Sequence, residues 1–146
     1  MIFDYQALFS NAQAVTTGAT ASTNIMDLGA PGTVAGASSA LVRNVSKGMP
    51  LPLRVQVTTT CTSGGSGTCA FAIQHSADAS SWTTLYTTSA IAVATLVAGY
   101  EPIPMYFLIP GVTNRYVRIL YTIATADFTA GNFTSGFTAG NQTNAD

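Results

Sequence analysis

The clearest signal in this sequence is an alternation of apolar and polar residues between Arg115 and Thr125. Every second side chain in this stretch is large and apolar or aromatic, namely Val117, Ile119, Tyr121 and Ile123. Successive side chains of a β-strand point to opposite faces of its sheet, so the alternation predicts a strand with one buried face.

Shorter stretches repeat this pattern and are separated by Gly, Pro, Asn and Ser. They predict further strands at residues 51–58, 68–75, 83–87, 92–97, 105–109 and 132–138. A flexible connection at residues 62–67 predicts that the first two of these pair as a hairpin. With about eight short strands and no long amphipathic helix, the chain is predicted to be all-β, an antiparallel β-sandwich of jelly-roll type.

The first 28 residues are predicted to form an N-terminal arm and first strand within the same domain. The apolar residues of the arm are Phe3, Tyr5, Leu8 and Phe9. Phe3, Leu8 and Ala12 match a short amphipathic helix of about two turns, and the equal alternative is an extended arm packed on the body or on a neighbour. So much apolar surface is not left in water, and we expect it to contact a partner. The jelly-roll body is then predicted at residues 29–139 and a flexible tail at residues 140–146.

Charged residues make up only 8% of the 146 residues, and the formal net charge is −1. Phosphate neutralisation requires clustered Lys and Arg, whereas the five basic residues here are scattered, so we expect no nucleic-acid partner. Catalysis requires titratable groups close together, and the chain has one histidine. We therefore expect a binding or structural protein and not an enzyme, with no metal and no cofactor. Low charge also favours association.

Two further expectations concern location. No apolar run approaches the roughly 20 residues of a membrane-spanning helix, so no membrane partner is expected. The first residues lack a basic segment followed by an apolar one, so we expect no secretory signal and synthesis in the cytoplasm.

A short segment contains the residue types of a hydrolytic triad, His75, Ser76 and Asp78. Adjacent positions in one loop do not readily give the geometry of a nucleophile, a base and an orienting acid. The alternative is a turn in which Asp78 and Ser80 cap backbone groups before Trp82 enters the core.

The same segment resembles turns of β-sandwich carbohydrate-binding domains, where an Asp-containing turn precedes a strand aromatic. Such binding requires exposed aromatic platforms, and the candidates are Trp82, Tyr86, Tyr100 and Tyr106. A carbohydrate-binding domain for adhesion to a phage or bacterial surface is therefore the alternative function.

Cys61 and Cys69 flank the predicted connection between two strands. They are candidates for a disulfide across a hairpin, which would remove roughly 2 to 3 kcal/mol of loop entropy. The equal alternative is two reduced, buried thiols, as cytoplasmic synthesis favours. Two thiols and one histidine match no four-ligand metal spacing.

Arg115 and Arg118 lie three positions apart on one predicted strand and so point to opposite faces. They do not form a phosphate clamp. Each is a candidate to pair with Asp27, Glu101 or Asp127, or to anchor an assembly interface.

Three stretches together resemble a known family. They are Ser10-Asn11-Ala12-Gln13-Ala14-Val15, Ser22-Thr23-Asn24-Ile25-Met26-Asp27-Leu28-Gly29 and Pro110-Gly111-Val112-Thr113-Asn114-Arg115-Tyr116-Val117-Arg118-Ile119-Leu120-Tyr121. In this order and spacing they are similar to the cement, or decoration, proteins of tailed-phage heads, of the jelly-roll type first known from a Bordetella phage.

The resemblance implies a non-enzymatic subunit on the outer surface of the phage head. Such a subunit associates with copies of itself, as a dimer or trimer, and clamps neighbouring copies of a major capsid protein of HK97-like fold. No catalytic residue is carried over. The segment around Cys61 and Cys69 and the Phe-Thr-Gly repeats near the C-terminus depart from the family pattern. The predicted partner interface comprises Phe3, Tyr5, Leu8, Phe9, Asn114, Arg115 and Arg118.

Overall fold

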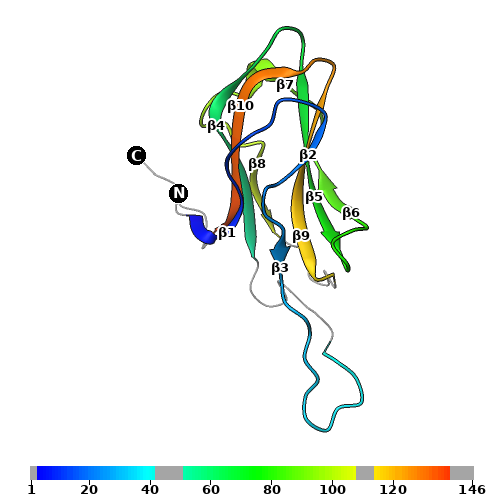
Figure 1. The fold of residues 1–146 in the computed structure, drawn as a ribbon. Coiled ribbons are helices and arrows are strands. Elements are labelled where there is room, and N and C mark those ends of the chain that lie inside the picture. The colour runs from blue at the N-terminus through cyan, green and yellow to red at the C-terminus, as the bar shows by residue number, and fades with distance from the viewer. Residues whose placement is uncertain (1–2, 42–50, 108–113, 139–146) are drawn as a thin grey trace.

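The computed structural model describes residues 3–41, 51–107 and 114–138 and consists of two antiparallel sheets packed face to face (Figure 1). The four-stranded sheet has the order β1 (Phe3–Ala14), β10 (Phe128–Thr138), β4 (Pro52–Ser63), β8 (Ile103–Phe107). The six-stranded sheet has the order β2 (Ala19–Ala21), β9 (Tyr116–Ala124), β5 (Thr68–Ser76), β6 (Thr83–Thr87). Two short strands complete it: β3 (Met26–Asp27) pairs with β9, and β7 (Ile91–Ala92) pairs with β5. A 3-10 turn, η1 (Val93–Thr95), follows β7. This order is that of a jelly roll and confirms the predicted all-β sandwich.

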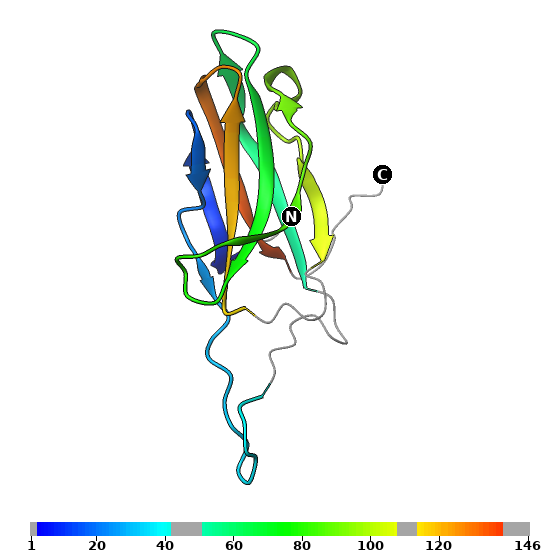
Figure 2. The same cartoon turned by 90° about the vertical axis from the view of Figure 1, so that its right-hand side faces the viewer.

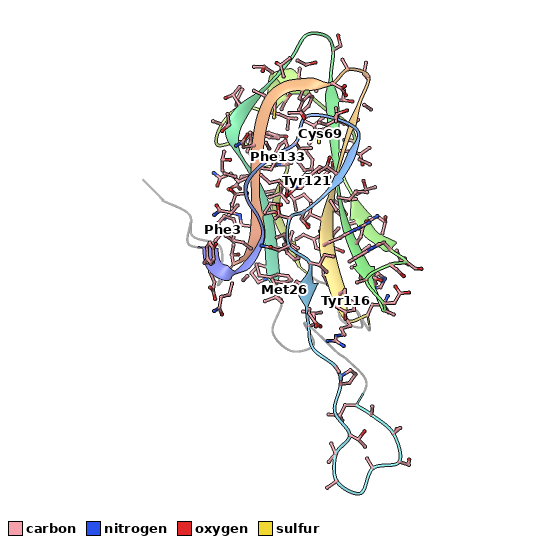
Figure 3. The ribbon with its side chains drawn as sticks, viewed as in Figure 1. Phe3, Met26, Cys69, Tyr116, Tyr121 and Phe133 are labelled. Carbon is pink, nitrogen blue, oxygen red and sulfur yellow. The ribbon has the colours of Figure 1, made fainter. Side chains whose placement is uncertain are left out.

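The core lies between the sheets, where the predicted alternation of β9 places Val117, Ile119, Tyr121 and Ile123. At its centre the Tyr121 and Phe133 rings stack with centroids 5.3 Å apart, and Phe71 meets both edge-on at 5.8 and 5.2 Å. Figure 3 shows Tyr121 and Phe133 pointing towards each other from opposite sheets. Such edge and stacked contacts add to the burial of large apolar rings.

Strand β10 starts at Phe128, four residues before the predicted start. The sequence pattern does not predict this start, because a bulge interrupts the alternation of apolar and polar residues. Phe128 and Phe133 are five residues apart, an odd spacing that would place them on opposite faces of a regular strand. The register of β10 against β4 shifts between Phe128 and Phe133, and Gly131 within this bulge has φ 153°. Both rings are thereby buried in the core together with Phe137.

The N-terminal arm is a strand and not a helix, so the extended alternative is the one observed. β1 pairs with β10 and has several register shifts. Phe9 is fully buried, with its ring centroid 5.0 Å from that of Phe137, and Leu8 is also buried. The arm is therefore an integral strand of the four-stranded sheet.

Two other predictions are wrong. Strands β4 and β5 do not form a hairpin, because they belong to different sheets and the connection between them crosses the sandwich. Residues 92–97 are not a strand, because only Ile91–Ala92 pair and the chain then makes the η1 turn that buries Leu96. Strand β8 begins two residues before the predicted start, and the predicted tail at residues 140–146 lies outside the described residues.

Beyond β3 the chain leaves the sandwich as a long loop that projects from one end (Figures 1 and 2). Residues 30–41 of this loop are all exposed. Two backbone hydrogen bonds hold its tip, from Ala37 N to Val34 O and from Leu41 N to Gly32 O, both 2.9 Å. This segment, residues 29–41, is called the projecting loop below.

Candidate interaction site

The outer face of the six-stranded sheet carries one cationic side chain on its central strands, Arg118 of β9. Its partner across the β5–β9 pair is Gln74. Arg118 donates from Nε to Gln74 Oε1 at 2.9 Å, and Gln74 Nε2 donates to Thr84 Oγ1 of β6 at 3.2 Å. The guanidinium also lies over the Trp82 ring, 4.0 Å from its centroid. Hydrogen bonding and stacking therefore fix the position of this guanidinium.

The turn before Trp82 is built on Asp78. Its Oδ1 accepts hydrogen bonds from the backbone N–H groups of Ser80 and Ser81, both 2.9 Å, and from the Ser76 hydroxyl at 2.9 Å. These donors, the Ser81 backbone first, hold the pKa of Asp78 below its usual range. The predicted capping role of Asp78 is confirmed, but Trp82 does not enter the core. It stays half-buried on the outer face, because Arg118 covers its ring there.

The residues of the hydrolytic triad are not assembled. His75 pairs with Val117 on the core side of β5, whereas Ser76 is the next residue and points to the opposite face. The Ser76 hydroxyl bonds to Asp78 and not to His75. Burial lowers the pKa of His75, and its Nδ1 atom is buried with no hydrogen-bond partner among the described residues.

Two ion pairs have contrasting surroundings. Arg115 donates to Asp27 from Nε and Nη2, both at 2.6 Å, in an exposed bidentate pair. This is one of the pairings expected from the sequence. Arg54 is 7% exposed and pairs with Glu101, so the second pair is largely buried.

The residues predicted to face a partner are unequally accessible. Tyr5 is 79% exposed, and Phe3, Asn114, Arg115 and Arg118 are half-buried, with the Arg115 side chain in its pair with Asp27. Leu8 and Phe9 are buried within their own chain, which leaves no surface for a partner to contact.

The aromatic rings weighed for sugar binding are engaged within the chain, and Tyr100 is partly buried and packs against the core. One face of Trp82 is occupied by the Arg118 guanidinium. Tyr86 is 40% exposed, and its ring lies 5.1 Å from that of Tyr106, whose hydroxyl is buried without a hydrogen-bond partner among the described residues.

Cys61 and Cys69 are both free and buried. They lie in β4 and β5, in opposite sheets, and so face the core across the sandwich and not across a hairpin. Burial raises the pKa of Cys61 to about 11, and burial together with the neighbouring Cys61 raises that of Cys69 to about 12. At neutral pH both are protonated.

The described parts of the chain contain no group of three His, Cys, Asp or Glu side chains positioned to hold a metal ion. No helix among the described residues is long and apolar enough to span a membrane. An open polar hollow lies where Thr17–Gly18 meet residues 123–127, and its one carboxylate, Asp127, accepts a hydrogen bond from Thr17.

The sequence matches the Bbp16 family over residues 9–137, from the buried part of β1 to the penultimate residue of β10. The chain belongs to the Bbp16 family. This family is named after a Bordetella phage protein, which is consistent with a phage protein. None of the curated proteins compared with this Bbp16-family chain matches it.

Sequence reasoning missed Gln74 and the position of Trp82. The pairing of Gln74 with Arg118 depends on the register of two strands 44 residues apart. Nothing in the sequence fixes that register, although an Arg and a Gln on the outer faces of two alternating strands are a signal that could have prompted the question.

Proposed function

We propose that this Bbp16-family protein is a structural protein of the virion that decorates and cements the phage head. In this role it associates with copies of itself, as a dimer or trimer, and bridges neighbouring subunits of a major capsid protein of HK97-like fold on the outer surface of the head. It acts through contacts and not as an enzyme, and nucleic acid and membranes are not its partners.

The projecting loop is the observation that supports this function most directly. Val34 is 54% exposed and Leu41 is 57% exposed, and the loop contains no charged residue. Exposed apolar side chains on a projecting loop are suited to insertion between neighbouring subunits. The loop also extends the reach of a small domain beyond its own sandwich (Figure 2).

Multiple weak contacts are sufficient for such a role. A cement protein engages several subunits at once, so each contact raises the effective concentration of the next. Tyr5 on β1 is an exposed aromatic residue outside the loop and provides a second contact point. The low net charge of −1 leaves little self-repulsion between closely spaced copies.

The test is to add the purified protein to expanded heads of the phage that encodes it, prepared without this protein, and to measure the amount retained. We expect saturable retention of the wild type. The double variant Val34→Ser and Leu41→Ser should be retained roughly tenfold less at limiting concentration, because two apolar contacts are lost.

The matched control is Val97→Ser, which removes an apolar residue that is 47% exposed, two positions after η1 and outside the projecting loop. It should be retained like the wild type. Failure of the wild type to bind heads would refute the proposal. If the protein does not bind heads but binds saturably to a glycan array, the carbohydrate-binding alternative is favoured instead.

A further inference from the structure

The Arg118 guanidinium is held in place by a hydrogen bond at Nε and by a ring against one face, and its Nη1 and Nη2 atoms make no hydrogen bond within the described residues. Gln74 accepts from Nε, and Trp82 covers one face of the group. Gln74 is itself buried and held by Thr84. Within the described part of the chain, Nη1 and Nη2 of Arg118 donate no hydrogen bond. Neither nitrogen is among the buried polar atoms without a partner, so both remain accessible.

This arrangement differs from that of the other described arginine side chains. Arg54 and Arg115 each pair with a carboxylate of the same chain. Arg118 is fixed without a carboxylate, although holding a long side chain in one conformation costs rotamer entropy. A guanidinium positioned in advance binds a planar acceptor with less further loss of entropy.

The side chains next to Arg118 on β5 and β9 are uncharged, and the nearest charged groups are Asp78, bonded to Ser76, and the Arg115–Asp27 pair beside Tyr116. The neighbouring pairs on this face of β5 and β9 are Ala72 with Leu120 and Ser76 with Tyr116. Ala72 is buried and Leu120 is half-buried, so neighbouring side chains cover this part of the face. Arg and Trp are among the residue types most often found as anchors of protein interfaces.

We propose that Arg118 is a docking site for a carboxylate, an Asp or Glu side chain of a neighbouring virion protein that is not a copy of this chain. The carboxylate accepts hydrogen bonds from Nη1 and Nη2, end-on to the guanidinium, while Gln74 and Trp82 hold the group. This inference rests on the proposed function and adds to it the chemistry that one contact recognises.

A second copy is the less suitable donor of this carboxylate. Each carboxylate in the described residues already accepts a hydrogen bond within its own chain: Asp4 from Gln6 N, Asp27 from Arg115, Asp78 from Ser80 and Ser81, Glu101 from Arg54 and Asp127 from Thr17. Among the described residues, a copy would have to offer a carboxylate that is already engaged, whereas a different protein need not; Asp146 lies outside the described residues.

Trp82 is the only tryptophan in the chain, so its fluorescence reports on this site alone. The test titrates the whole protein at low ionic strength with a capped tetraglutamate peptide and, separately, with a capped tetraglutamine peptide. We expect a saturable change in Trp82 fluorescence with glutamate only. In Arg118→Lys and Arg118→Gln the apparent affinity should fall at least about tenfold, because Lys keeps the charge but not the planar fork.

Arg115→Gln is the matched control, because Arg115 is already paired with Asp27, and it should titrate like the wild type. The inference is overturned if the wild type gives no saturable change, if the glutamine peptide acts equally, or if Arg118→Lys binds as well as the wild type. Unchanged thermal unfolding of each variant shows that its fold is intact.

Retention on heads separates this inference from the proposed function. A wild type that binds heads while Arg118→Gln binds equally well overturns the docking role of Arg118 and leaves the cement function standing. A wild type that fails to bind heads overturns the cement function, and the peptide titration then decides the carboxylate site by itself.

Discussion

Replacing Tyr121 by Phe removes one hydroxyl group at the centre of the core and tests how the two sheets are joined. Tyr121 Oη lies 2.8 Å from Ser10 Oγ of β1 and 2.9 Å from Ser135 Oγ of β10, and Ser10 Oγ donates to Gln13 Oε1 at 2.6 Å. An amide oxygen only accepts, so Ser10 gives its proton to Gln13 and must accept from Tyr121. Tyr121 has one proton, so Ser135 donates to it.

The consequence of the substitution follows from this order. In Tyr121→Phe the Ser135 hydroxyl, which is fully buried, loses its acceptor, whereas Ser10 still donates to Gln13. A buried polar group left without a partner costs about 1–3 kcal/mol. We therefore expect the free energy of unfolding to fall by about 1–3 kcal/mol and the melting temperature by roughly 2–4 °C for each kcal/mol.

The assay is urea unfolding followed by Trp82 fluorescence for Tyr121→Phe, Ser135→Ala and the double variant. Ser135→Ala alone leaves Tyr121 donating to Ser10. In the double variant the Ser135 hydroxyl is absent, so no buried donor is left without an acceptor. The loss in free energy of unfolding should therefore be smaller than the sum of the two single losses by about 1 kcal/mol. Additive costs, or a Tyr121→Phe variant as stable as the wild type, would refute the reasoning.

Three further predictions concern other buried groups. Burial raises the pKa of Cys61 from 9.0 to about 11 and that of Cys69 from 9.0 to about 12. The two protonated thiols therefore contribute fully to stability below pH 9, and this contribution is lost as the pH rises from 9 towards 12. The loss is at most about 1.4 kcal/mol per pH unit for each thiol, and urea unfolding across this pH range measures it. Glu101→Gln leaves the buried Arg54 without its carboxylate and should lower the free energy of unfolding by about 1–3 kcal/mol. Gly131→Ala places a Cβ atom 2.6 Å from Cys61 Sγ at a positive φ and should cost about 1–3 kcal/mol in the same assay.

Each of these predictions has a matched control. Cys61→Ala combined with Cys69→Ala should flatten the alkaline fall, and an equally steep fall would contradict the assignment to the thiols. Asp27→Asn removes the charge from the exposed ion pair and should leave stability unchanged within error, so an effect as large as that of Glu101→Gln would argue against the role of burial. Gly32→Ala meets no atom within 4 Å and should be neutral, so a loss equal to that of Gly131→Ala would exclude the close contact as the cause.

The parts of the fold that the sequence predicts are those set by local pattern. β9 was predicted from its alternation because one of its faces is buried along its whole length. The start of β10 was missed because the bulge at Gly131 breaks the period of two. The stretch at residues 92–97 was assigned wrongly because a continuous apolar run has no alternation to separate a strand from a turn.

The pairing of strands is set by contacts far apart in the chain and was harder to predict. Adjacent strands β4 and β5 suggested a hairpin, but in this jelly roll the two belong to different sheets. The site around Arg118 depends on the same long-range register, which aligns it with Gln74, and on a turn that brings Trp82 over it. The Asp78 cap within that turn was predicted, because it involves only residues within three positions.

The central claim is that this jelly roll cements a phage head, and electron cryomicroscopy of purified mature virions tests it most directly. The claim predicts density for the chain on the outer surface of the head, with the projecting loop reaching between neighbouring capsid subunits. Virions that lack this protein altogether, or that carry it away from any junction between capsid subunits, would contradict it.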